Sequence, residues 1–179
     1  RSITEGLAIV YGELESTNYS GIGISFGGGL CNICLAYLSV PVASFSVAKA
    51  GDYIDSSAAA AVGDLSNRIR LRKEDSFHFN GYFSDKSLQA LTVYYDDMIS
   101  TVVSQMKERS APCCQTGRFK TPVPVVLSGG TAMPKGFRDR FESALRTCDF
   151  PVPISEVRLA TNPLETTAKG ALIAALSDE

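Results

Sequence analysis

The sequence contains no tryptophan, a single histidine (His78) and no long hydrophobic run. Because no apolar stretch approaches the roughly 18 residues needed to cross a bilayer, we expect no membrane span. The 179 residues carry a formal net charge of −2 and a pI near 5.5, which argues against a broad nucleic-acid surface. Hydrophobic residues make up 45% and charged residues 20%, as is ordinary for a globular domain. The composition therefore predicts one domain or one lobe.

The five cysteines do not suggest a metal site. Cys31 and Cys34 have the C-x-x-C spacing of many metal ligands, but they lie in a predicted strand. Side chains three residues apart on a strand point to opposite faces, so one ion cannot bind both. Cys113, Cys114 and Cys148 add no second chelating pair. We therefore expect free thiols in a reducing cytoplasm.

Hydrophobic periodicity predicts a mixed α/β fold. The first half has a helix followed by three strands with short turns, which is typical of an antiparallel meander. The second half alternates strands with helices, which favours parallel pairing. Helices are predicted over residues 4–14, 51–73 with a break near Gly63, 85–109, 134–147 and 163–176; strands over 21–26, 31–39, 42–48, 123–128 and 154–159; a loop over 110–122; and a short strand or ordered loop over 77–83. We expect a mixed five-stranded sheet with helices on both faces.

Two glycine clusters directly follow predicted strands. The first covers residues 27–29 and the second residues 129–131, about a hundred residues further on. Because glycine has no side chain, successive backbone N–H groups can converge on an anion or lie against a flat ring. Either cluster alone is equally consistent with an ordinary turn. Two clusters at strand ends favour a site for a nucleotide.

Five short segments occur in the order and approximate spacing of a known family. They are Glu5-Gly6-Leu7-Ala8-Ile9-Val10-Tyr11-Gly12, Ser25-Phe26-Gly27-Gly28-Gly29-Leu30, Ala50-Gly51-Asp52-Tyr53-Ile54-Asp55, Leu127-Ser128-Gly129-Gly130-Thr131-Ala132-Met133-Pro134 and Ala168-Lys169-Gly170-Ala171-Leu172. In that order they resemble the lobe-connecting helix, the second phosphate loop, a helix-opening turn, the adenosine loop and the closing helix of actin-like ATPases. That superfamily includes actin, MreB-type filament proteins, Hsp70 chaperones and sugar kinases. The resemblance covers nearly the whole chain and implies a ribonuclease-H-like second lobe.

The resemblance also implies a site for ATP and Mg²⁺. The implied binding residues are Gly27, Gly28 and Gly29 for the phosphates, Gly51 for the ribose, Gly129, Gly130, Thr131 and Met133 for the adenosine, and Asn67 and Arg70 near the adenine. Glu5 matches the residue that positions the attacking water, and phosphoryl transfer depends mainly on orientation and charge neutralisation. No residue is assigned to the metal. Asp52 and Asp55 open a helix, where capping explains a carboxylate at least as well as metal contact.

Two departures from the family pattern argue against efficient hydrolysis. Ser25 stands where relatives have the aspartate that organises Mg²⁺ and water, and Leu30 stands where they have a threonine. A hydroxyl carries no charge and holds hydrated Mg²⁺ less firmly than a carboxylate does. Glycine amides can still bind phosphate whatever the neighbouring side chains are. We therefore expect ATP binding with weak or absent hydrolysis.

Three functions remain open at this point: an ATP-binding lobe, a non-catalytic scaffold or assembly module with the same fold, and one lobe of a small-molecule kinase of that superfold. Because the chain starts at Arg1 rather than at methionine, we expect a longer cytoplasmic protein whose first lobe completes the nucleotide clamp. Self-assembly or other protein partners are also expected, whereas nucleic acid is not. The basic residues Arg68, Arg70, Arg72 and Lys73 are interpreted as a mainly solvated helix face.

Overall fold

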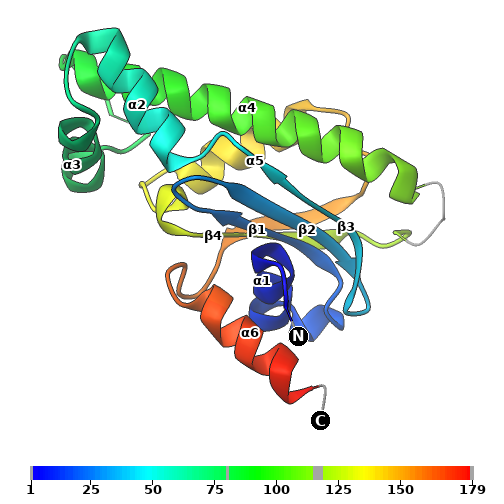
Figure 1. Ribbon diagram of the computed structural model, residues 1–179. Coiled ribbons are helices and arrows are strands. Elements are labelled where there is room, and N and C mark those ends of the chain that lie inside the picture. Colours follow the sequence, from blue (N-terminus) through cyan, green and yellow to red (C-terminus); the bar gives the residue numbers. More distant parts are fainter. Residues whose placement is uncertain (1, 80, 115–118, 178–179) are drawn as a thin grey trace.

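A computed structural model describes residues 2–79, 81–114 and 119–177 (Figure 1). Its centre is one five-stranded sheet in the order β3-β2-β1-β4-β5. The strands are β1 (Gly21–Phe26), β2 (Cys31–Tyr37), β3 (Val40–Val47), β4 (Val123–Ser128) and β5 (Ile154–Leu159). Strand β2 is antiparallel to both β1 and β3, whereas β4 is parallel to both β1 and β5. The predicted mixed sheet with its antiparallel meander is confirmed.

Helices cover both faces of the sheet, as predicted. Figure 1 shows α1 (Glu5–Glu13) and α6 (Thr166–Leu176) on one face, and α2 (Gly51–Val62), α4 (Lys86–Cys114) and α5 (Phe137–Thr147) on the other. Helix α3 (Ser66–Ser76) follows α2 beyond the sheet, and the short 3-10 turns η1 (Glu15–Thr17) and η2 (Gly130–Ala132) complete the set. Within the described ranges, no helix is both long enough and apolar enough to span a membrane.

Because side chains alternate between the two faces along each strand, the sheet has a separate hydrophobic core on each face. Ile22, Ile24 and Phe26 of β1 belong to the larger core under α2, α4 and α5. Cys31 lies in this larger core, while Cys34 lies in the smaller core that includes α1 residues. The two thiols therefore point to opposite faces, as predicted. Burial raises the pKa of each thiol from 9.0 to about 12.

The structure corrects several predicted boundaries. Helix α4 continues to Cys114, although residues 110–122 were expected to be a loop. Pro112 is tolerated near the end of the helix, where buried Ser110 and the Cys113–Val42 contact hold the last turn against the body. The β2–β3 turn falls at residues 38–39, both with positive φ, rather than near Pro41. The described parts of 77–83 are loop, one of the two predicted alternatives, whereas the later helices α5 and α6 begin at residues 137 and 166 rather than 134 and 163.

The break predicted near Gly63 is confirmed, and it separates α2 from α3. Gly63 has a φ of 72° and its amide bonds the Ala59 carbonyl, which ends α2 in the left-handed geometry that glycine favours. Helix α3 then begins at Ser66 and turns its polar side chains toward the start of α2. Glycine at this position therefore sets how α3 lies relative to α2.

Candidate functional site

Parallel pairing of β1 and β4 brings the two glycine clusters together. Ser25 of β1 pairs with Ser128 of β4, so both strands end at the same edge of the sheet. The bends that follow line a single cavity of about 580 Å³. Its lining residues are Gly27, Gly28, Gly51, Arg70, Lys73, Glu74, Phe77, Tyr95, Gly130, Thr131, Met133, Pro134, Lys135 and Leu164. Two segments far apart in sequence thus form one site.

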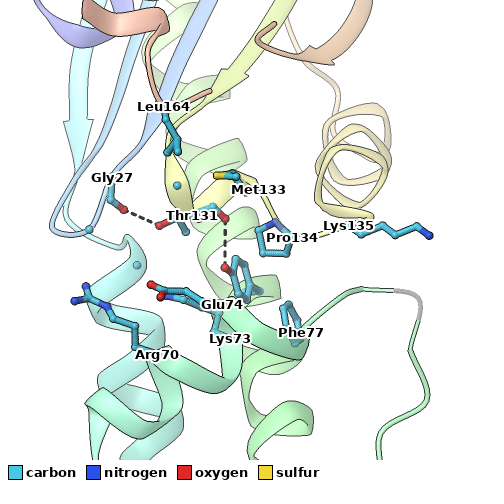
Figure 2. Close-up of a pocket in the computed structure, with 14 residues that line it drawn as sticks. Gly27, Arg70, Lys73, Glu74, Phe77, Thr131, Met133, Pro134, Lys135 and Leu164 are labelled. Carbon is cyan, nitrogen blue, oxygen red and sulfur yellow. Dashed lines mark hydrogen bonds between the residues drawn. The ribbon is translucent and has the colours of Figure 1, made fainter. Parts of the chain in front are cut away.

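Hydrogen bonds join the two bends and the start of α2. The Thr131 hydroxyl donates to the Gly27 carbonyl at 2.8 Å, which Figure 2 shows as a dashed line. The Gly51 amide donates to the same carbonyl at 3.1 Å. A Cβ on Gly51 would lie 2.6 Å from the Thr131 Oγ1 atom, so only glycine allows this approach. The network holds the bends in a fixed relation.

Gly129 packs beneath the first bend rather than facing the cavity. Its φ is 92°, a conformation that L side chains rarely adopt. A Cβ at this position would also lie 2.4 Å from the Phe26 carbonyl oxygen. Its amide donates to the Pro163 carbonyl at 3.0 Å, so it has no free donor for a ligand. The second bend is therefore defined by backbone packing.

The first bend keeps free donors. Among the hydrogen bonds between described residues, none is donated by the amide of Gly28 or Gly29. Both residues are exposed, and α2 begins beside them with its amide end toward the bend, because the Asp52 amide donates to the Gly28 carbonyl at 2.8 Å. Free amides together with the positive end of a helix dipole favour an anion.

Helix α3 supplies the opposite wall, as Figure 2 shows for Arg70, Lys73 and Glu74. The interpretation of the basic stretch as a solvated face is wrong for Lys73, whose side chain is only 9% exposed and lies 2.7 Å from Asp55 Oδ1. The Arg70 guanidinium lies 3.4 Å from Asp55 and 2.9 Å from Asp52. Carboxylates therefore neutralise the two cations on this wall.

Tyr95 of α4 forms the floor of the cavity. It is fully buried, its ring stacks on Phe77 with centroids 5.1 Å apart, and its hydroxyl donates to the Thr131 carbonyl at 3.3 Å. Burial raises the pKa of Tyr95, and the charges of Asp55 and Glu74 raise it further, so the hydroxyl stays protonated as a donor. The floor thus supports the second bend from below.

Most, but not all, of the residues predicted for the nucleotide line this cavity. Those that do are Gly27, Gly28, Gly51, Arg70, Gly130, Thr131 and Met133. Gly29, Gly129 and Asn67 lie outside the lining, and Asn67 is exposed on α3. These roles stay predictions, because no ligand is part of the structure.

Glu5 also lies outside the lining, on the α1 side of the sheet. Its carboxylate accepts a hydrogen bond from Asn32 Nδ2 at 2.9 Å, and the Ser46 hydroxyl donates to Asn32 Oδ1 at 2.6 Å. Glu5 is therefore held by neighbouring strands rather than by the bends. Its catalytic role stays a prediction.

Sequence reasoning missed half of the cavity. The unassigned lining residues are Lys73, Glu74, Phe77, Tyr95, Pro134, Lys135 and Leu164. Lys73 and Glu74 follow Arg70 by three and four residues, so helical periodicity would have placed them on the same face. Tyr95 and Leu164 carry no such local signal, since only tertiary packing brings α4 and the 160s loop to the bends.

Comparison with known protein families decides which family this is. A family model described as Volactin matches residues 1–175, almost the whole chain. The chain belongs to the Volactin family. No curated protein matches this Volactin chain.

Several solved structures share the fold of this Volactin family member. A crystal structure of ethanolamine utilization protein EutJ from Carboxydothermus hydrogenoformans matches 94% of the chain with a TM-score of 0.66 and 23% identity. A non-polymerising MamK mutant bound to AMPPNP matches 98% with a TM-score of 0.70 and 20% identity, and a MamK double helical filament matches 98% with 0.72 and 19%. The predicted actin-like ATPase fold is confirmed. The chain spans only 54–58% of the length of these proteins.

Proposed function

We propose that this chain is the nucleotide-binding lobe of an actin-like ATPase and holds ATP with Mg²⁺ between its two glycine bends. The observation that carries the proposal is that bends 104 residues apart line one cavity and are joined by the Thr131–Gly27 hydrogen bond. The cavity volume of about 580 Å³ suits a small-molecule ligand. The AMPPNP-bound state of MamK, which shares the fold, supports the choice of ligand.

The two ends of the cavity match the two ends of a nucleotide. Free amides at Gly28 and Gly29, next to the amide end of α2, suit the phosphates. At the other end Met133 and Leu164 are 51% and 67% exposed, and a flat base would cover their apolar surface. Arg70 of α3 lies on the opposite wall, where its guanidinium is paired with Asp52 beside the first bend. A second lobe facing this cavity would enclose the nucleotide from the other side.

Nucleotide binding is tested by titrating AMPPNP with Mg²⁺ into the full-length protein and measuring heat. Gly130→Val is the decisive variant, because Gly130 lines the cavity and a Cβ there meets only Leu164, another lining residue, at 3.9 Å. We expect the dissociation constant to rise by at least about tenfold, while the melting temperature without nucleotide stays close to that of the wild type. Ala61→Val adds comparable volume at an exposed α2 position outside the lining and should bind normally.

No binding by the wild type at millimolar AMPPNP would contradict the proposal. Normal binding by Gly130→Val would also contradict it, since the added side chain must occupy the space assigned to the nucleotide.

A second candidate keeps the fold and drops hydrolysis, leaving a scaffold or assembly module. It is favoured by Ser25, which stands where the actin-like ATPases that the chain resembles have a carboxylate. It is also favoured by Glu5, whose carboxylate accepts a hydrogen bond from Asn32 outside the cavity. The double helical filament of MamK shows that the fold is compatible with self-assembly. Phosphate release by the wild type, Ser25→Asp and a Ser25→Ala control distinguishes the two. A gain in Ser25→Asp alone supports the ATPase lobe, and no gain supports the scaffold.

A further inference from the structure

We propose that Asp52 supplies the carboxylate that faces Mg²⁺ at the phosphate bend, in place of the aspartate that Ser25 does not provide. The inference rests on the proposed nucleotide site. It identifies the side chain of this chain whose negative charge contributes to Mg²⁺ binding at that site.

The side chains of Ser25 and Asp52 lie in different places relative to the first bend. Ser25 is inside β1, paired with Asn32 on one side and Ser128 on the other. Because its neighbours Ile24 and Phe26 face the larger core, Ser25 faces the α1 side, and it does not line the cavity. Ser25 as a whole is buried, with 5% of its surface exposed. Where the actin-like ATPases that this chain resembles have an aspartate, this chain therefore has no carboxylate.

Asp52 lies directly over the first bend. Its amide donates to the Gly28 carbonyl at 2.8 Å, which anchors the start of α2 to the bend. A Cβ built on Gly28 would lie 3.3 Å from Oδ1 and 3.4 Å from Oδ2 of Asp52, so both carboxylate oxygens face the bend. The carboxylate thus stands within contact of the glycine whose free amide is assigned to phosphate.

One oxygen of this carboxylate is held and the other is available. Oδ1 accepts a hydrogen bond from Arg70 at 2.9 Å. Among the described residues, none donates a hydrogen bond to Oδ2. The Asp52 side chain is 62% exposed, which leaves room for a hydrated ion. Arg70 therefore orients the carboxylate without using up its capacity to accept.

A single carboxylate is sufficient for this metal when phosphates are present. Mg²⁺ keeps several waters and is commonly held by one or two carboxylates together with the phosphates of the ligand. Within the described residues, no group of three or more His, Cys, Asp or Glu side chains is placed to hold a metal. We therefore expect Mg²⁺ to bind here only together with a nucleotide.

The charge of Asp52 gives this arrangement a measurable signature. Without Mg²⁺ the carboxylate repels the phosphates beside it, and with Mg²⁺ the ion bridges the two negative groups. The ratio of AMPPNP affinities in Mg²⁺ and in EDTA thus reports on Asp52. A residue with a purely structural role would change both affinities together and leave the ratio unchanged.

The test measures this ratio calorimetrically in the full-length protein. For the wild type we expect Mg²⁺ to tighten AMPPNP binding by about tenfold or more. Asp52→Asn keeps the size and can still accept from Arg70, and it should bring the ratio close to one. Asp52→Glu restores the charge and should recover part of the ratio. Asp75→Asn removes the same charge at an exposed α3 position outside the cavity lining, and should keep the wild-type ratio.

The outcomes distinguish a failure of this inference from a failure of the proposed nucleotide site. If Asp52→Asn binds AMPPNP and keeps the wild-type ratio, the inference is overturned and the nucleotide site stands. If Asp75→Asn loses the ratio equally, the effect is the general negative charge of this part of the chain and the inference is again overturned. If the wild type binds no AMPPNP under either condition, the nucleotide site and the inference fail together.

Discussion

The two faces of the sheet are packed by different means. On the α2, α4 and α5 side, bulky side chains fill the core, and the Phe26 ring meets Phe137 and Phe141 edge to face at 5.0 and 5.7 Å. On the α1 and α6 side, backbones approach directly, because a Cβ on Gly170 would lie 1.7 Å from the Ala8 carbonyl oxygen. The first face is sensitive to lost volume and the second to added volume.

The cavity borders the first face, because Phe77 and Tyr95 of its core line the space between the bends and α3. On the other face, glycines at positions 6, 12, 23 and 170 let α1 contact both the sheet and α6 through backbone atoms. That face has the smaller core. Four predictions test this contrast.

The largest effect is expected for Gly170→Ala. Besides the Ala8 oxygen at 1.7 Å, the new methyl would meet the Ala8 carbonyl carbon at 2.5 Å and the Gly12 amide at 3.0 Å, so α6 must move away from α1. We expect the free energy of unfolding to fall by about 3 kcal/mol, measured by denaturant titration. Gly29→Ala, with no atom within 4 Å of its Cβ, should change it by less than about 1 kcal/mol. If Gly170→Ala and Gly29→Ala lowered the free energy of unfolding equally, close backbone packing between α1 and α6 would be contradicted.

A smaller effect is expected for Glu13→Gln on the same face. The Glu13 carboxylate is only 5% exposed and accepts from Arg158 Nη1 at 2.6 Å and from the Thr161 amide at 3.0 Å, which joins α1 to the β5–α6 connection. Loss of its charge should lower the free energy of unfolding by about 2 kcal/mol near neutral pH. Glu156→Gln is the matched control, because this 58% exposed carboxylate lies 3.7 Å from the same arginine.

The Glu13 effect should depend on pH with a defined sign. Burial alone raises the pKa of Glu13, but hydrogen bonds from Arg158 and Thr161 outweigh it and hold the pKa below the usual 4.5. The stabilisation is therefore complete above about pH 4.5 and is lost as the pH falls through the lower folded-state value. The difference between wild type and Glu13→Gln should shrink under acid, in denaturant titrations at pH 7 and pH 3. A constant difference would show that the charge is not the source.

The smallest effect concerns the two cysteines, one on each face. With the pKa of Cys31 and Cys34 raised by burial from 9.0 to about 12, the thiolate at pH 8 is about 1000-fold scarcer than for an ordinary thiol. Neither should react with iodoacetamide in the folded protein, and both should react in guanidinium, as read by peptide mass spectrometry. Rapid labelling of one alone would mean that its face opens in solution.

Local sequence features predicted the secondary structure well but the site only in part. Gly63 gave the α2–α3 break because left-handed backbone suits glycine, and the meander followed from short turns between alternating strands. The end of α4 was missed because Pro112 usually signals a stop, whereas contacts with β3 keep the helix intact. Lys73 was misjudged because its partner Asp55 lies on a different helix.

By itself, the sequence determined the elements, their order and the presence of two glycine bends, because these depend on side-chain periodicity and on backbone freedom within a few residues. Only the tertiary structure decided that β1 and β4 are neighbours, and so that the bends share one cavity. It also decided that Asp52 lies over Gly28 while Glu5 lies on the opposite side of the sheet. Strand order is set by packing of the whole core, which no local pattern encodes.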